Sequence, residues 1–163
     1  MRPADLLTLL RDFYAEKRAQ RARHEASALA VRQYDFNNTY QYVINREDLH
    51  LTWLREAIES LGGTTPDAGA GDAAPAAPAG RDATAAVVRD DAQATRALVE
   101  RWESRLGAVT HARHRLMLNV ILGEIREHQR FFEQAAAGRT DLLGRRTSGS
   151  QPVGGVLATR WVE

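Results

Sequence analysis

The stretch INREDLHLTWLREAIESLGG, residues 44–63, has the period of an amphipathic helix that stops at a double glycine. Its apolar face can be followed at spacings of four and three residues. The positions on this face are Val43, Glu47, His50, Leu54, Ala57 and Leu61. Two of the six are therefore a carboxylate and an imidazole at places where core residues belong. The pattern predicts that Glu47 and His50 point into the protein.

Composition limits the classes of protein to consider. A chain of 163 residues with 44% apolar and 26% charged residues is typical of one soluble globular domain. The net charge of +1 gives no reason to expect a nucleic acid or an anionic membrane as partner. There is no cysteine, which excludes disulfides, thiolate metal sites and cysteine nucleophiles. The N-terminal residues have early acids and no long apolar run, so we expect no leader or membrane span and a cytoplasmic location.

Four long helical segments are predicted, and no strand pair, so the expected class is all-α. The first runs over about 3–33 and the second to about 61, with a turn and a capping Asp35 in the segment 34–38. The third starts near 89, buries Ala92, Thr95, Val99, Trp102, Leu106 and Val109, and breaks between Gly107 and Thr110. The fourth ends at Gly138. The expected organisation is a helical domain over 1–138 and an extended C-terminal tail over 139–163, in which Trp161 is a candidate docking anchor.

The segment between the second and third helices is long. Residues 64–85 are rich in alanine, glycine and proline, and this composition indicates a flexible linker. A helix of about 26 residues is about 39 Å long at ~1.5 Å per residue, and 22 extended residues at ~3.3 Å each can span it. The pattern favours two helical hairpins joined by one crossover, the ferritin-type connection. A simple up-and-down bundle with a long loop is the alternative.

The fourth helix repeats the polar pair of the second. Its expected apolar face carries Met117, Val120, Ile121, Glu124, His128, Phe131 and Ala135. The first and third helices offer acids that match. If the first turn centres near Phe36, Glu25 lies at the height of Glu47, eleven residues to either side. Glu103 matches Glu124 if the second turn falls near His114.

Four glutamates and two histidines in a bundle core would need cations between them. Carboxylate oxygen and imidazole nitrogen suit iron and manganese. One glutamate from each of two helices, with a glutamate–histidine pair from each of the others, is the dinuclear carboxylate arrangement. We therefore predict two iron or manganese ions. The candidate ligands are Glu25, Glu47, His50, Glu103, Glu124 and His128, with Glu16 and Glu127 as alternates and His24 also near the inner face.

Two segments resemble a known family. EDLHLTWLREAIESLGGTTPD, residues 47–67, resembles the second helix of ferritin-like proteins of the bacterioferritin and rubrerythrin branch. There, E-x-x-H precedes an apolar stripe and an ending close to L-G-G-x-x-P. GEIREHQRFFEQAAAG, residues 123–138, resembles the second metal motif of these bacterial proteins. The resemblance covers about 3–138 and implies a four-helix bundle with a dinuclear site that oxidises iron or reduces oxygen or peroxide.

The chain departs from that family at two points. Ile125 stands three residues before His128, where the motif has a glutamate. The absence of cysteine also excludes a rubredoxin-like iron site. The alternative function is therefore a metal-free, degenerate bundle that serves as a structural or protein-interaction module. A homo-oligomer is left open by the sequence.

Each candidate residue also has a simpler interpretation. Glu47 and His50 can be a buried hydrogen-bonded pair, and Glu25 and Glu103 solvated helix formers. His111 and His114 can bind a metal or lie exposed at a turn. The basic run KRAQRARH, residues 17–24, is read as a solvated helix face. A hemerythrin-like site is disfavoured because the positions four residues after His50 and His128 are Leu54 and Phe132.

Overall fold

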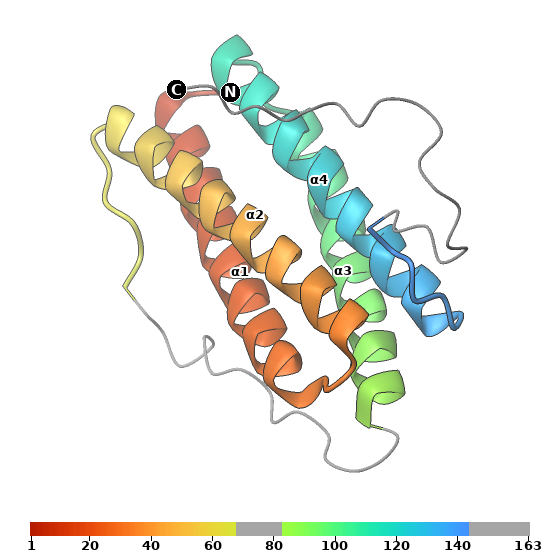
Figure 1. Cartoon of the computed structure of the whole chain (residues 1–163). Helices are drawn as coiled ribbons and strands as arrows, with labels where there is room; N and C mark the ends of the chain where they lie inside the picture. Colours follow the sequence, from red (N-terminus) through yellow and green to blue (C-terminus); the bar gives the residue numbers. More distant parts are fainter. Residues whose placement is uncertain (68–82, 144–163) are drawn as a thin grey trace, which may run out of the picture.

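The computed structural model describes residues 1–67 and 83–143. They form four helices: α1 (Pro3–Ala30), α2 (Tyr34–Ser60), α3 (Ala83–Gly107) and α4 (Ala112–Ala136), shown in Figure 1. No strand occurs within these two ranges. Most of the expected linker and tail, with Trp161, lies outside the described residues.

The helices pack as two antiparallel hairpins. α1 pairs with α2 and α3 with α4, while α1 also contacts α3 and α2 also contacts α4. In Figure 1, α2 ends at one end of the bundle and α3 begins at the opposite end, so the two helices run in the same direction. The expected all-α class and four-helix bundle are confirmed.

Two helix ends follow the glycine signals of the sequence. Gly62 adopts φ 74°, and the N–H groups of Gly62 and Gly63 donate to the carbonyls of Glu59 and Ile58. This is the Schellman motif, in which a left-handed residue satisfies the last carbonyls of a helix. The same pattern recurs at Gly138, with φ 89°. Both predicted stops are confirmed.

Other boundaries were predicted wrongly. The segment 34–38 is not a turn, because α2 already begins at Tyr34 and Asp35 lies in its first turn. The first turn is residues 31–33. α3 begins at Ala83, six residues before the expected start. The buried face of α4 is displaced in part: Ile121, His128 and Ala135 are buried as expected, but Leu118, Ile125 and Phe132 are also in the core, and Val120 is exposed.

The core consists of two apolar clusters with a polar layer between them. One cluster surrounds Trp102 and Leu54, and the other surrounds Tyr40 and Phe132. The polar side chains lie at the middle turns of the four helices and continue the same buried faces. They are Lys17, Gln20, His24, Glu47, His50, Asp91, Thr95 and His128. The bundle therefore buries ionisable groups at its centre.

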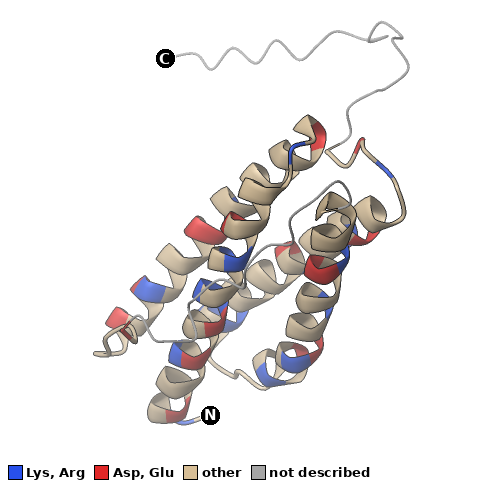
Figure 2. Ribbon diagram, turned by 90° about the horizontal axis from the view of Figure 1, so that it is seen from below, with Lys and Arg blue, Asp and Glu red and all other residues tan. Residues whose placement is uncertain are grey.

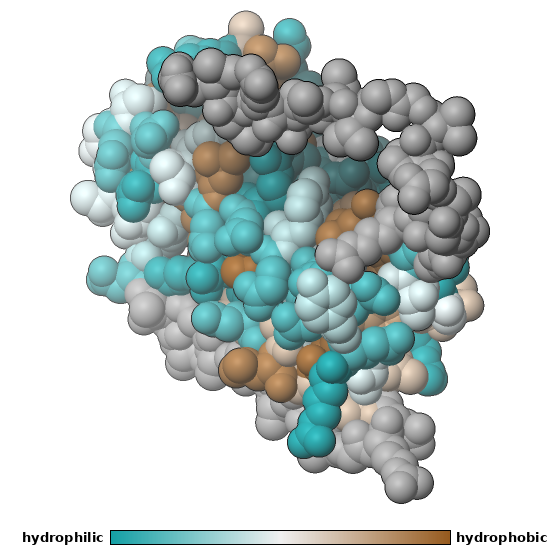
Figure 3. All heavy atoms as spheres, in the orientation of Figure 1, coloured by the Kyte–Doolittle hydropathy of each residue, from teal (hydrophilic) through white to brown (hydrophobic). Residues whose placement is uncertain are grey.

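The outer surface is that of an ordinary charged bundle. Acidic and basic residues alternate along the helices (Figure 2). The face displayed in Figure 3 is mostly hydrophilic, with small and separate hydrophobic patches. Among the described helices, none combines the length and the apolar character that a membrane crossing requires.

Candidate functional site

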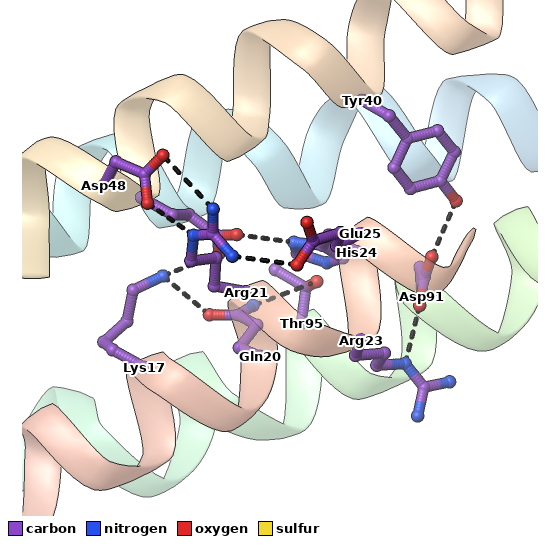
Figure 4. Close-up of polar contacts among 11 residues, drawn as sticks. Lys17, Gln20, Arg21, Arg23, His24, Glu25, Tyr40, Asp48, Asp91 and Thr95 are labelled. Carbon is purple, nitrogen blue, oxygen red and sulfur yellow. Dashed lines mark hydrogen bonds and ion pairs between the residues drawn. The ribbon is translucent and has the colours of Figure 1, made fainter. Parts of the chain in front are cut away.

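Glu47 lies at the centre of the polar layer and is fully buried. Its Oε1 accepts a hydrogen bond of 2.8 Å from Nζ of Lys17, and its Oε2 lies 3.0 Å from Nδ1 of His24. Lys17 also donates to Oε1 of Gln20 at 2.8 Å, and Gln20 donates to Oγ1 of Thr95 at 3.4 Å (Figure 4). One carboxylate is thus held by an ammonium and an imidazole, both without exposed surface.

The position of the first turn explains this set of partners. With the connection at residues 31–33, its centre is residue 32, and fifteen residues to either side are Lys17 and Glu47. The prediction that Glu25 faces Glu47 needed a turn centred near Phe36. In the structure Glu25 is exposed and pairs with Arg21, which also binds Asp48. Glu47 points inward as predicted, but beside Lys17 and His24 and not beside Glu25 or Glu16.

Glu124 lies at the edge of the layer, between α2 and α4. Its Oε2 accepts from Nε of Arg46 at 3.0 Å and lies 2.7 Å from Nε2 of His50. The second oxygen of Glu124 is paired with Nη2 of Arg46. The His50 ring is fully buried, whereas the side chain of Glu124 is 17% exposed. This acid is therefore neutralised by a cation at the rim of the bundle.

Three buried imidazoles have unused nitrogen atoms in this layer. Among the described residues, neither Nδ1 nor Nε2 of His128 has a hydrogen-bond partner, and Nδ1 of His50 and Nε2 of His24 also lack one. The rings of His50 and His128 are stacked with centroids 6.2 Å apart. A buried polar atom without a partner costs about 1–3 kcal/mol. A bound water, ion or other ligand that nitrogen lone pairs or N–H groups can contact would satisfy four such atoms in one layer.

The protonation states follow from burial and from the neighbouring charges. Burial, with Lys17 nearby, lowers the pKa of His128 to about 2 and that of His50 to about 4. Both rings are therefore neutral at pH 7, the form that binds metals. Burial alone would raise the pKa of Glu47, but the charges and hydrogen bonds of His24 and Lys17 outweigh it and lower the pKa. Glu47 is an anion at neutral pH.

A second buried carboxylate, Asp91 on α3, lies in the same polar layer. Asp91 is fully buried and accepts hydrogen bonds of 2.6 Å from the Tyr40 hydroxyl and 2.6 Å from Nε of Arg23 (Figure 4). Burial and the charge of Asp91 raise the pKa of Tyr40, so the phenol keeps its proton. The rings of Tyr40 and Phe132 pack against His24, with centroids 6.2 and 5.0 Å away.

The remaining candidates are spread over the surface. Glu103 is exposed and pairs with Arg126. Glu16 accepts from the indole N–H of Trp102 and from Arg101. Glu127 lies 3.5 Å from the Tyr42 hydroxyl.

Thr95, and not Glu103, takes the inner position near the height of Glu124, because the second turn falls between Gly107 and Ala112 instead of near His114.

The structure therefore gathers Glu47, His50, Glu124 and His128 and leaves Glu25 and Glu103 outside. Within residues 1–67 and 83–143, no three histidine, aspartate or glutamate side chains already converge on one ion position. The predicted set of four glutamates and two histidines does not fit two ions in this arrangement. A smaller set, His24, Glu47, His50, His128 and Glu124, carries the imidazole and carboxylate donors that transition metals prefer. Among the described residues, four of its buried imidazole nitrogens have no hydrogen-bond partner.

Sequence reasoning missed Lys17 and underrated His24. Both lie in the run KRAQRARH, which was interpreted as solvated. The signal was present in the period: Leu6, Leu10, Phe13, Lys17, Gln20 and His24 continue one buried face at spacings of three and four. The charge of the run concealed this continuity.

A groove lies between α2 and α4 beside the layer, with a volume of about 360 Å³. Its walls are mostly apolar, and Glu56, Ser60, Arg113 and His114 supply polar groups; the apolar residues are Trp53, Ala57, Leu116, Met117 and Val120. The Trp53 ring lies 6.1 Å from that of His50. Trp53 therefore both lines the groove and lies next to His50.

Comparison of the chain with protein-family models, curated proteins and solved structures finds no match.

Proposed function

We propose that the protein is a ferritin-like bundle whose polar layer binds a divalent transition metal, with iron or manganese as the expected ions. The observation that carries the proposal is the group of buried imidazole nitrogens without partners around Glu47. His50, His128 and Glu124 would supply ligands on the α2–α4 side, and Glu47 and His24 on the α1–α2 side. Neutral imidazole and carboxylate are the donors that such ions prefer.

The direction of the helices supports the ferritin-like part of this proposal. Parallel α2 and α3 need a connection along the length of the bundle, so we infer one crossover between residues 64 and 82.

The residues of the chain would prepare the site for chemistry. Bound iron or manganese would supply electron transfer to oxygen or peroxide, or oxidation of further iron. Trp53 and the groove would admit a small molecule to the His50 side, while the apolar clusters above and below exclude bulk water. Arg46 would orient Glu124 through its two hydrogen bonds.

A metal-free structural module is the second candidate function. It is favoured by the ion pairs, since Lys17 already neutralises Glu47 and Arg46 already neutralises Glu124. In that case the layer specifies how the helices align, a role that buried polar groups play in some bundles.

Metal binding separates the two candidates. The protein should carry at least one iron or manganese ion per chain after growth with these metals, and cobalt titration should give visible d–d absorption. His128→Ala should weaken cobalt binding about tenfold or more, because it removes a nitrogen ligand. His111→Ala is the matched control, since His111 is an exposed residue at the N-cap of α4 whose ring lies against that of His114. No metal uptake by the parent protein would favour the structural module.

A further inference from the structure

Lys17 is the feature of the layer that a metal site does not require. It occupies a core position of α1 with no exposed surface, where a leucine or methionine would continue the apolar face. A buried ion pair stabilises a fold weakly, and well-packed apolar residues often do better. The presence of this ammonium in the core therefore needs an explanation other than stability.

The ammonium lies where its charge acts on the whole candidate site. Its Nζ contacts Oε1 of Glu47 at 2.8 Å, in the same buried layer of the bundle as His50 and His128. The layer is also balanced without any ion, because Lys17 and Glu47 have opposite charges, as do Arg46 and Glu124. A divalent ion that enters would meet the repulsion of an internal cation.

We propose that Lys17 is an internal cation that competes with a metal ion for the Glu47 carboxylate and thereby sets the affinity of the site. The inference rests on the proposed function. A metal on Glu47 would weaken or displace the contact of its Oε1 with the ammonium, because both cations draw on the same carboxylate, and the chain provides for this step. Nζ of Lys17 has a second acceptor in Oε1 of Gln20, and Gln20 is itself held by Thr95 on α3. The ammonium thus keeps a partner inside the bundle when Glu47 turns to a metal.

The test is the cobalt affinity of Lys17→Met, measured by competition with a chromophoric chelator, beside thermal unfolding in EDTA. We expect binding about 10- to 100-fold tighter than in the parent, because the competing charge is gone, and a lower melting temperature without metal, because Glu47 loses a partner. If Lys17 had a purely structural role, Lys17→Met would lower both the cobalt affinity and the melting temperature. Lys17→Arg should keep the parent affinity or weaken it. Arg126→Met is the matched control, since it removes an exposed cation from Glu103.

The outcomes separate this inference from the proposed function. If the parent binds cobalt and Lys17→Met binds no more tightly, the inference is overturned and the metal site stands. If neither protein binds cobalt, both proposals fail. If Lys17→Met does not fold in EDTA, the same measurements are made on Lys17→Gln. Should that variant also be unfolded, recovery of helical circular dichroism on cobalt addition supports the inference, and no recovery overturns it.

Discussion

At the scale of single residues, the carboxylates of this bundle differ in their partners and in how deeply they are buried. Glu124 binds Arg46 and His50 in a mostly buried position, whereas Glu103 and Glu25 make exposed ion pairs. Exposed pairs contribute about 0–1 kcal/mol. A buried donor left without its acceptor costs about 1–3 kcal/mol. Glutamates that look equivalent in the sequence should therefore respond very differently to substitution.

Glu124→Ala should lower the free energy of unfolding of the metal-free protein by about 1–2 kcal/mol, because it strands Nε2 of His50 and frees Arg46. Chemical denaturation in EDTA measures this loss. Glu103→Ala is the control and should cost less than about 0.5 kcal/mol.

The sign of this change has a consequence for function. A crowd of mutually repelling acids would gain stability when Glu124 is removed. A rise in stability would contradict the ion-pair geometry described above. A fall in stability, together with no iron uptake by the parent protein, would exclude the oxidoreductase interpretation.

At the scale of helices, the periodic pattern predicted most of the fold. The buried faces of α2 and α3 and the glycine stops agree with the sequence, because they depend on local spacing and on a backbone conformation that glycine favours. On α4 the prediction held for Ile121, His128 and Ala135 but chose Phe131 where the neighbouring Phe132 is the more deeply buried residue. Local patterns therefore predict which helices form. They predict less well how each helix is rotated about its own axis.

The site was harder to predict because it depends on where the turns fall. Moving the first turn centre from Phe36 to residue 32 changes the partner of Glu47 from Glu25 to Lys17, eight residues away on α1. That distance is about 12 Å along a helix at ~1.5 Å per residue. Gln33, the N-cap residue before α2, makes no side-chain capping hydrogen bond to the described residues, so no capping signal marked the boundary. An error of four residues in a loop therefore replaced an anion with a cation at the centre of the bundle.

The glycine ends allow a test at this scale. Gly138→Ala should destabilise the protein by about 1 kcal/mol, because φ is 89° there and a Cβ has open space around it, so that only the backbone is strained. Gly123→Ala is the matched control, since Gly123 lies inside α4 with nothing within 4 Å of a new Cβ. It should raise stability by about 0.5–1 kcal/mol. Thermal unfolding of both variants decides, and equal effects would contradict the left-handed helix end.

At the scale of the whole molecule, the polar layer joins two apolar clusters that each draw on several helices. Global unfolding exposes all the side chains of the layer together. The protonation of its histidines therefore changes the free energy of unfolding of the whole protein. Burial keeps His50 and His128 neutral in the folded chain, while both would titrate near pH 6.5 when unfolded. Between the lowered pKa values of the folded chain and the unfolded value near 6.5, the unfolded state therefore binds more protons than the folded state. The free energy of unfolding rises with pH in this range.

The free energy of unfolding in EDTA should accordingly reach its plateau above about pH 7.5 and fall as the pH drops toward 4.5. His114, whose pKa is also lowered by burial, adds to this slope. The lowered pKa values of Glu47 and Glu124 contribute mainly below about pH 4.5, since an unfolded glutamate titrates near 4.3. His128→Leu should reduce the slope between pH 6 and 5 by about 1.4 kcal/mol per pH unit, the effect of one proton. Urea denaturation across this range measures it, and an unchanged slope would mean that His128 is accessible to protons in the folded bundle.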